Sequence, residues 1–209
     1  MSNPISKISD PTPVLNIIFC GVGGQGVLVA SDILAEVAMN AGYDVKKSEV
    51  HGMAQRGGSV VSQVRFGRKV YSPLIARGKG DYLVAFERLE TLRYLDYLKS
   101  GGLVIINNQK ITPLTVFFEG VDYPENIEEL CRKRTNKIIT VNGMEIAETL
   151  GNPRVLNVVL LGVLSKFLEF DQSYWHEAIK NRVPPKTFAV NLKGFEQGQR
   201  LGGDKMMRG

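Results

Sequence analysis

The chain alternates between short, almost continuous apolar runs and longer stretches in which apolar residues recur every three or four positions. Apolar runs of this kind are typical of strands that are covered on both faces. They predict strands at 14–20, 81–86, 103–107, 117–121 and 137–141, and a second strand is expected at 43–49, after the first helix. The helical spacing predicts helices at 27–40, 87–99, 124–134, 143–150, 155–170, 173–182 and 187–201. Strands that alternate with helices predict an α/β fold, a three-layer α/β/α sandwich around one sheet.

One region departs from this alternation. Residues 59–66 alternate apolar and polar side chains, Gly67-Arg68 supply a turn, and residues 69–72 continue the chain. This pattern predicts an antiparallel β-hairpin. The sheet is therefore expected to be mixed.

The pattern contains no internal repeat and no linker, so one domain is expected to span residues 14–201. Residues 1–13 are polar with three prolines and are expected to form a flexible arm. Residues 202–209 are expected to form a flexible tail.

Composition narrows the class of protein. Hydrophobic residues make up 44% and charged residues 22%, which is ordinary for a soluble globular chain. No apolar run approaches the roughly 20 residues that span a bilayer, and the N-terminus lacks the apolar core of a secretory signal. We therefore expect a cytoplasmic protein. The net charge of +5 is spread along the chain without basic blocks, so neither a nucleic-acid nor a membrane partner is expected.

Metal chemistry has little support in this chain. Its two cysteines, Cys20 and Cys131, are too few for an iron–sulfur cluster, which normally takes four. His51 and His176 lack the spacing of metal ligands. Cys20 ends an apolar strand and is expected to be a buried small hydrophobe.

Four glycines within six residues separate the first strand from the first helix. Gly21, Gly23 and Gly26 satisfy G-x-G-x-x-G, a pattern that gives a tight turn and a helix N-terminus suited to a phosphate or carboxylate. Glu49 lies roughly where a ribose-binding acid would follow in a Rossmann-like fold. The alternative is that the glycines only pack the helix against the sheet.

A second glycine segment, Ser48–Gly58, follows the second strand. If both segments leave the same strand edge, as in doubly wound sheets, they form one site. Arg56 offers a bidentate fork to an anion, His51 can shift protons, and the glutamines can donate to a carbonyl. Alternatively, these side chains only tie the loop down. The candidate cofactor-binding residues are Gly21, Gly23, Gly24, Gln25, Gly26, Glu49, His51, Gln55, Arg56 and Gly57.

Together, Gly21-Val22-Gly23-Gly24-Gln25-Gly26 and the segment from Ser48 to Gly58 resemble the gamma domain of 2-oxoacid:ferredoxin oxidoreductases. Within that family, the chain looks most like the small (beta) subunits that serve indolepyruvate. The similarity runs from about Asn16 to Leu201.

The resemblance implies an oxidative decarboxylation of arylpyruvates with coenzyme A as co-substrate. Acyl-coenzyme A, carbon dioxide and reduced ferredoxin would be the products. Thiamine diphosphate, Mg and [4Fe-4S] clusters would lie on a large alpha subunit, the partner in a heterodimer or larger complex that also meets ferredoxin. This chain would bind none of these cofactors and would be inactive alone. Its two glycine segments would position the acyl intermediate or coenzyme A, and no catalytic residue is assigned.

Three alternatives remain open at this point. The chain is a subunit of a pyruvate or 2-oxoglutarate enzyme of the same family, a free-standing nucleotide-binding oxidoreductase with a Rossmann turn, or a purely structural subunit. The hairpin predicted at 59–72 argues against the nucleotide-binding oxidoreductase, because it interrupts the succession of parallel strands.

Overall fold

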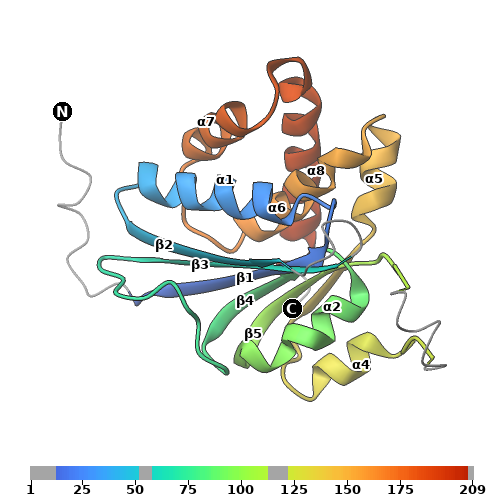
Figure 1. The fold of residues 1–209 in the computed structure, drawn as a ribbon. Coiled ribbons are helices and arrows are strands. Elements are labelled where there is room, and N and C mark those ends of the chain that lie inside the picture. Colours follow the sequence, from blue (N-terminus) through green and yellow to red (C-terminus); the bar gives the residue numbers. More distant parts are fainter. Residues whose placement is uncertain (1–12, 52–57, 113–121, 207–209) are drawn as a thin grey trace.

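The computed structural model describes residues 13–51, 58–112 and 122–206 and shows one six-stranded sheet with helices on both faces (Figure 1). The strands are β1 (Leu15–Val22), β2 (Asp44–His51), β3 (Ser59–Gly67), β4 (Gly80–Ala85), β5 (Leu98–Asn107) and β6 (Ile138–Val141). The α-helices are α1 (Val27–Asn40), α2 (Arg88–Tyr94), α4 (Ile127–Arg132), α5 (Gly143–Thr149), α6 (Leu156–Ser165), α7 (Gln172–Arg182) and α8 (Phe188–Met206). Short 3-10 turns are η2 (Leu95–Tyr97), η3 (Pro153–Val155) and η4 (Pro185–Thr187).

The strands lie in the order β2-β3-β1-β4-β5-β6. Strand β3 is antiparallel to both of its neighbours, β2 and β1, while β1, β4, β5 and β6 pair in parallel. Strand β2 therefore runs in the same direction as β1. The carboxyl ends of every strand except β3 consequently meet at one edge of the sheet, the edge where doubly wound folds bind ligands.

The central strands are buried on both faces, which explains their unbroken apolar sequence. In β1, Ile17 and Phe19 join the core beneath α1, while Ile18 and Cys20 join the core beneath α2. All four side chains are fully buried. The predicted three-layer α/β/α architecture with a mixed sheet is thus confirmed.

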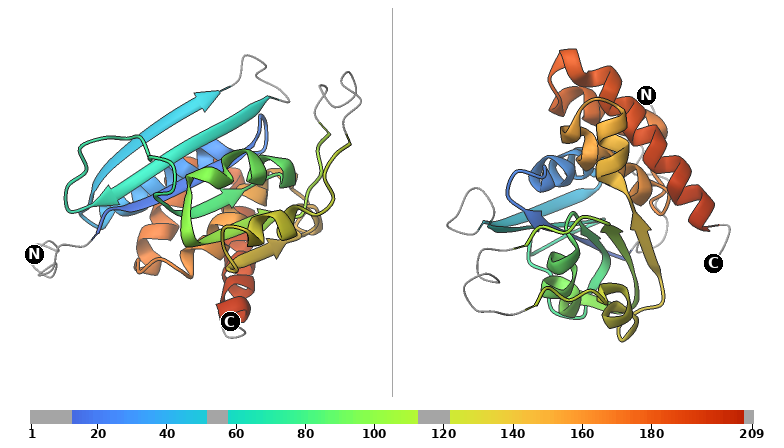
Figure 2. Two further views of the ribbon diagram at one scale, coloured as in Figure 1. Left: turned by 90° about the horizontal axis from the view of Figure 1, so that it is seen from below. Right: turned by 90° about the vertical axis from the view of Figure 1, so that its right-hand side faces the viewer.

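The helical layer on one face of the sheet is thicker than the layer on the other face. Helices α1, α5, α6, α7 and α8 lie on one face of the sheet, and α2 and α4 lie on the other (Figure 1). Every residue of α6 is buried, because the sheet lies on one side of it and α8 on the other. A second view shows α8 as the long outer helix of this layer (Figure 2).

Glycines allow α8 to pack unusually close to α6. A Cβ on Gly198 would lie 2.0 Å from the Val159 carbonyl oxygen, and one on Gly202 would lie 2.8 Å from the Val163 carbonyl oxygen. On α6, a Cβ on Gly162 would lie 2.1 Å from the Phe195 carbonyl oxygen. Backbone therefore meets backbone along this contact, and larger side chains cannot be accommodated.

The predicted hairpin at 59–72 is wrong in its second strand. Both edges of β3 are already paired, with β2 and with β1, so residues 69–72 have no strand edge to join. Side chains bind this segment instead: Arg65 donates to the carbonyl oxygens of Ser72 (2.7 Å) and Leu74 (3.1 Å). The Val70 N–H donates to Asp44 (3.0 Å). The sequence-adjacent strand that pairs antiparallel with β3 is therefore β2, which precedes it, and not residues 69–72, which follow it.

Two other boundaries differ from prediction. The helix expected at 87–99 ends as α2 at Tyr94, and β5 already begins at Leu98. The tail expected from residue 202 is wrong over residues 202–206, because α8 continues to Met206 and packs Gly202 against α6. The strand expected at 117–121 and most of the 1–13 arm lie outside the described residues.

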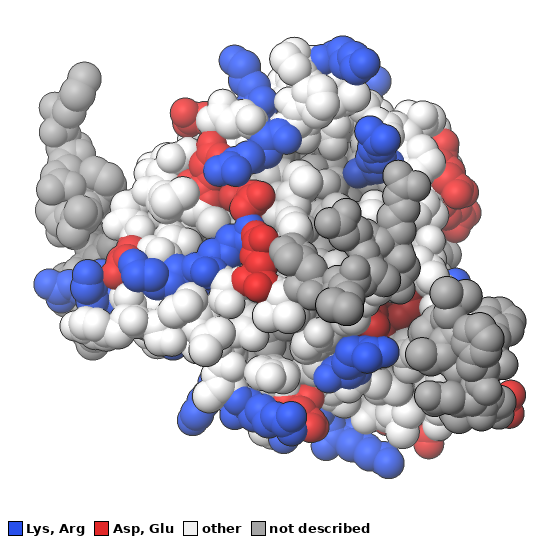
Figure 3. All heavy atoms as spheres, in the orientation of Figure 1, with Lys and Arg blue, Asp and Glu red and all other residues white. Residues whose placement is uncertain are grey.

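The surface carries both signs of charge. On the face drawn in Figure 3, Lys and Arg side chains are interspersed with Asp and Glu. In the described part of the chain, no helix combines the length and apolarity that a membrane crossing requires.

The contact between α6 and α8 gives a stability prediction. Gly198→Ala should lower the free energy of unfolding by about 2 kcal/mol or more, because the new methyl group overlaps the Val159 carbonyl. Gly203→Ala is the matched control on the same helix, since among the described residues its Cβ would meet nothing closer than Lys166 Cε at 3.9 Å. That control should gain up to about 1 kcal/mol from helix propensity. Urea unfolding measures both, and equal effects would contradict the close packing.

Candidate functional site

The two glycine segments meet at the carboxyl edge of the sheet. The Gly23 N–H donates to the Gly58 carbonyl oxygen (2.9 Å), which joins the turn after β1 to the residue that precedes β3. In the sheet register, Val22 lies opposite Ser59, and Val60 lies opposite His51. The prediction that both segments leave one strand edge is therefore confirmed.

Within the turn, the glycines have different roles. A Cβ on Gly21 would lie 2.7 Å from Phe86 Cβ, so this glycine packs the turn against β4. Gly26 begins α1 with φ of +82°, and Gly24 has φ of +101°. Both values favour glycine. Gly24 is exposed, and no described residue lies within 4 Å of its Cβ position, so the turn is open to solvent there.

Gln25 is committed to the fold. Its Oε1 accepts from the Val22 N–H (2.7 Å), and its Nε2 donates to the Phe86 carbonyl oxygen (3.0 Å) and to Gln109 Oε1 (2.9 Å). Both of its N–H groups are thus used to join the ends of β1, β4 and β5. A donation from Gln25 to a ligand carbonyl, as the sequence suggests, would require one of these bonds to break.

The side-chain amides of Asn107 and Gln109 complete this hydrogen-bond network, and neither was a candidate from the sequence. Asn107 is fully buried at the end of β5, donates to the Phe86 carbonyl oxygen (2.9 Å) and to Gln109 Oε1 (3.2 Å), and accepts from the Gly143 N–H (3.0 Å). The sequence signal for Asn107 and Gln109 is their position, because polar residues directly follow the apolar residues 103–106. We call Gln25, Asn107 and Gln109 the amide network.

A buried carboxylate lies at the end of β4. Glu87 is 1% exposed, and its Oε1 accepts from the Tyr123 hydroxyl (2.6 Å) and the Ile111 N–H (3.1 Å). Its Oε2 caps α2 by accepting from the Glu90 N–H (3.0 Å). Burial, followed by the bond to Glu87, raises the pKa of Tyr123 well above its usual range. Glu87 thus fixes residues 111 and 123 beside the same edge.

A second buried carboxylate, Glu90, connects α2 to β3. Its side chain accepts from the Ser59 hydroxyl and forms an ion pair with Arg93 (3.0 Å). Burial raises the pKa of Glu90 despite these two partners, and the neighbouring Glu87 adds to the rise. The Cys20 thiol donates to the Glu90 backbone carbonyl (3.5 Å), and burial raises its pKa well above the usual value. Cys20 is therefore a neutral buried thiol, as expected.

The second glycine segment is described only at its ends. Glu49 lies on β2 and forms an ion pair with Lys47, whose ammonium group also pairs with Asp32 of α1. Strand β3 lies between β2 and β1, and Glu49 lies opposite Ser62, which lies opposite Phe19. Glu49 is therefore two strand spacings, about 10 Å, from β1 and further than that from the first glycine turn. The side chain of His51 lies outside the described residues, as do Gln55, Arg56 and Gly57, and their binding roles stay predictions.

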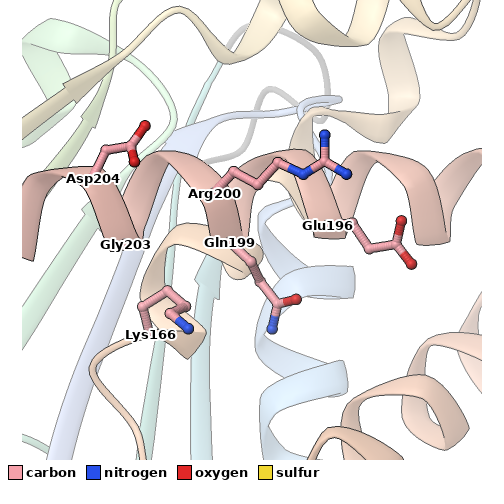
Figure 4. Close-up of a pocket in the computed structure, with 6 residues that line it drawn as sticks. All are labelled: Lys166, Glu196, Gln199, Arg200, Gly203 and Asp204. Atoms are coloured by element: carbon pink, nitrogen blue, oxygen red, sulfur yellow. The ribbon is translucent and has the colours of Figure 1, made fainter.

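A surface hollow of about 400 Å³ lies elsewhere, on α8 and the end of α6 (Figure 4). It is lined by Lys166, Glu196, Gln199, Arg200, Gly203 and Asp204. These side chains carry two charges of each sign, and none is a predicted site residue. Within the described residues, no three His, Cys, Asp or Glu side chains gather where they could hold a metal ion.

The amide network gives a second stability prediction. Gln25→Ala should lower the free energy of unfolding by about 1–3 kcal/mol, because the Val22 N–H loses its partner. Gln197→Ala, an exposed glutamine on α8, is the control and should change stability by less than about 0.5 kcal/mol. Denaturant unfolding of both variants is the measurement. A Gln25 variant as stable as the control would show that the network contributes little.

Glu90 gives a prediction about pH. Because its folded pKa lies above the ordinary value of 4.5, its contribution to stability is present below pH 4.5 and is lost as pH rises through the folded pKa. Glu90→Gln cannot titrate, so the wild type should lose stability relative to this variant as the pH rises above 4.5. Urea unfolding at several pH values measures the difference. A difference that stays constant or grows in favour of the wild type would contradict the raised pKa.

Comparison with known proteins identifies the family. The model of the pyruvate ferredoxin/flavodoxin oxidoreductase family matches residues 16–201. The indolepyruvate oxidoreductase subunit IorB of Pyrococcus horikoshii is 43% identical over 188 residues, which cover 88% of this chain and 93% of that protein.

Among solved structures, the gamma subunit of a keto/oxoacid ferredoxin oxidoreductase from Geobacter sulfurreducens aligns with a TM-score of 0.67 and 24% identity, covering 90% of this chain and 98% of that one. A 2-oxoglutarate:ferredoxin oxidoreductase from Magnetococcus marinus, solved with 2-oxoglutarate, coenzyme A and succinyl-CoA bound, aligns with a TM-score of 0.71 and 21% identity over 91% of this chain and 31% of that one. The resemblance predicted from the two glycine segments is confirmed, and the chain belongs to the pyruvate ferredoxin/flavodoxin oxidoreductase family.

Proposed function

We propose that this chain is the small subunit of a 2-oxoacid:ferredoxin oxidoreductase that acts on arylpyruvates, chiefly indolepyruvate. The complex would convert the 2-oxoacid and coenzyme A to acyl-coenzyme A and carbon dioxide while it reduces ferredoxin. The observation that carries the proposal is the 43% identity to an indolepyruvate oxidoreductase subunit over 93% of that subunit. The likeness extends over the whole folded unit, from β1 through most of α8.

In this proposal, thiamine diphosphate, Mg and the [4Fe-4S] clusters belong to a large alpha subunit. The cysteines of the small chain agree with that division. Iron–sulfur clusters are bound by thiolates. Cys20 and Cys131 are both buried, and burial raises the pKa of Cys131 to about 11, so both thiols are held in the neutral form.

The small subunit would bind and position coenzyme A or the acyl intermediate at the carboxyl edge of the sheet. Gly24 leaves the first turn exposed, and no side chain of the described residues caps the start of α1, so the first N–H groups of this helix would be available to an anionic ligand. Coenzyme A and its acyl product carry phosphates suited to such a position. The coenzyme A bound in the Magnetococcus marinus enzyme, which shares this fold, supports the proposal.

The free-standing nucleotide-binding alternative has less support. A ribose-binding acid must follow the strand beside the glycine turn. Here the antiparallel strand β3 occupies that position, and Glu49 is displaced to β2 and paired with Lys47.

Reconstitution tests the proposed function. This chain, co-purified with a thiamine-containing large subunit, should reduce ferredoxin when indolepyruvate and coenzyme A are supplied. Each chain alone is the control and should be inactive, because the cofactors and the binding edge are on different chains. Ferredoxin reduction is followed by its absorbance change.

The outcomes separate three levels of the proposal. Activity with pyruvate or 2-oxoglutarate in place of indolepyruvate would keep the subunit role and overturn the substrate. A stable complex with full activity in Gln25 and Arg56 variants would favour a purely structural subunit. Neither complex nor activity, together with tight nicotinamide nucleotide binding by this chain alone, would favour the Rossmann alternative.

A further inference from the structure

Strands β2 and β3 are covered by a helix on one face of the sheet and not on the other. Lys47 of β2 faces α1, because it pairs with Asp32 of that helix. Side chains alternate along a strand, so Lys46, Ser48 and Val50 project from the opposite face. The left view of Figure 2 looks onto that face and shows α2 and α4 over other strands, while no helix lies over β2 and β3.

The segment 68–79, which joins β3 to β4, crosses this face instead, and we call it the crossing segment. Its Val70 and Ile75 side chains are buried. Gln63 of β3 accepts from the Ile75 N–H (2.6 Å), and Arg65 donates to two carbonyl oxygens of the segment. The crossing segment is therefore fixed on β3 and gives this face a defined outer surface.

Three large apolar side chains are exposed on that surface. They are Tyr71 (89% exposed) and Leu74 (60%) on the crossing segment and Val50 (58%) on β2. Among the described residues, the one other exposed large apolar side chain is Met39 (51%), on α1 and thus on the opposite side of the sheet. Scattered single residues of this kind are ordinary, whereas several on one face indicate an interaction surface.

The strand register places these apolar side chains in one line. Val50 lies opposite Val61, which is two residues, about 7 Å, along β3 from Gln63. Gln63 binds the backbone of the residue after Leu74. Tyr71 lies three residues before Leu74 on the crossing segment. The line therefore runs along the uncovered face toward Val50, the residue before the end of β2.

The charge around this line is positive. The crossing segment has no acidic residue and four cationic ones, Arg68, Lys69, Arg77 and Lys79. Arg77 pairs with Asp96 (3.4 Å), and the Asp44 carboxylate is shared between Lys46 (2.7 Å) and Lys69 (3.3 Å). A protein that covers this surface must therefore present apolar side chains together with carboxylates.

We propose that this surface, the line of Val50, Tyr71 and Leu74 with its basic surroundings, docks the large thiamine-bearing subunit. The inference rests on the proposed function for the identity of that partner. In that function the cofactors and the ligand edge are on different chains, so the large subunit must approach the carboxyl edge. Val50 brings the surface to that edge. A second copy of this chain fits less well, because two positive surfaces would face each other.

Exposed positions allow tests that leave the core intact. Tyr71→Glu and Leu74→Glu each place a carboxylate where the partner should present apolar and acidic groups. Met39→Glu is the matched control, because it makes the same change at an exposed apolar residue on the opposite side of the sheet. Arg68→Glu tests the contribution of charge. Urea unfolding of each variant ensures that comparisons are made between folded proteins.

The first measurement titrates a thiamine-containing large subunit with the full chain and follows binding by calorimetry. Tyr71→Glu and Leu74→Glu should each weaken binding by about tenfold or more, and Arg68→Glu should weaken it in the same direction. Met39→Glu should bind like the wild type. Equal binding by the Tyr71 and Leu74 variants and the wild type would overturn the surface, as would a wild type that does not bind the large subunit.

The second measurement separates other occupants of the surface and the proposed function itself. Sedimentation of the chain alone should show the same oligomeric state for wild type and Tyr71→Glu, and a dimer that this substitution dissociates would assign the surface to a second copy. Normal binding of the large subunit with a raised KM for ferredoxin would assign it to ferredoxin. Either result would overturn the inference and leave the proposed function intact. A wild-type complex that the surface variants weaken, but that oxidises no 2-oxoacid, would count against the function alone.

Discussion

The carbonyl oxygen of Phe86 is the constraint on which the ligand edge of this protein depends. It lies where β4 ends, and it receives amide donors from the turn after β1 and from the end of β5. Because a carbonyl oxygen can only accept hydrogen bonds, Gln25 and Asn107 must both turn their amide nitrogens toward Phe86. The Val22 and Gly143 N–H groups fix the other ends of those amides, so the glycine turn, β5 and the start of α5 are held in one geometry. Preorganised polar groups of this kind are what a binding edge requires.

The thick helical layer supports that edge from behind. Helix α6 is buried on every side because α8 approaches it at backbone distance, and its first turn delivers Asn157 to the glycine turn. Packing of the core and placement of a polar group are therefore linked through one helix. Loose packing between α6 and α8 would move Asn157 relative to α1.

The position of β3 distinguishes this sheet from a dinucleotide-binding fold. An antiparallel strand between β2 and β1 moves the acid of β2 away from the first glycine turn and brings Gly58 to that turn instead. The acid of β2 is therefore not placed beside the first glycine turn, where a ribose-binding acid would be needed. This agrees with a positioning role in a multi-subunit oxidoreductase.

The sequence by itself determined the alternation of strands and helices, the buried face of α1, the glycine turn and the family, because each depends on local periodicity or on a short contiguous motif. It did not determine the partners of β3, since pairing depends on which strand edges remain free once the whole sheet has formed. It placed Gln25 at the site but could not show that both of its N–H groups are used within the fold. Asn107 and Gln109 were identified only in three dimensions, because the ends of β1, β4 and β5 are distant in sequence and meet only when the sheet forms.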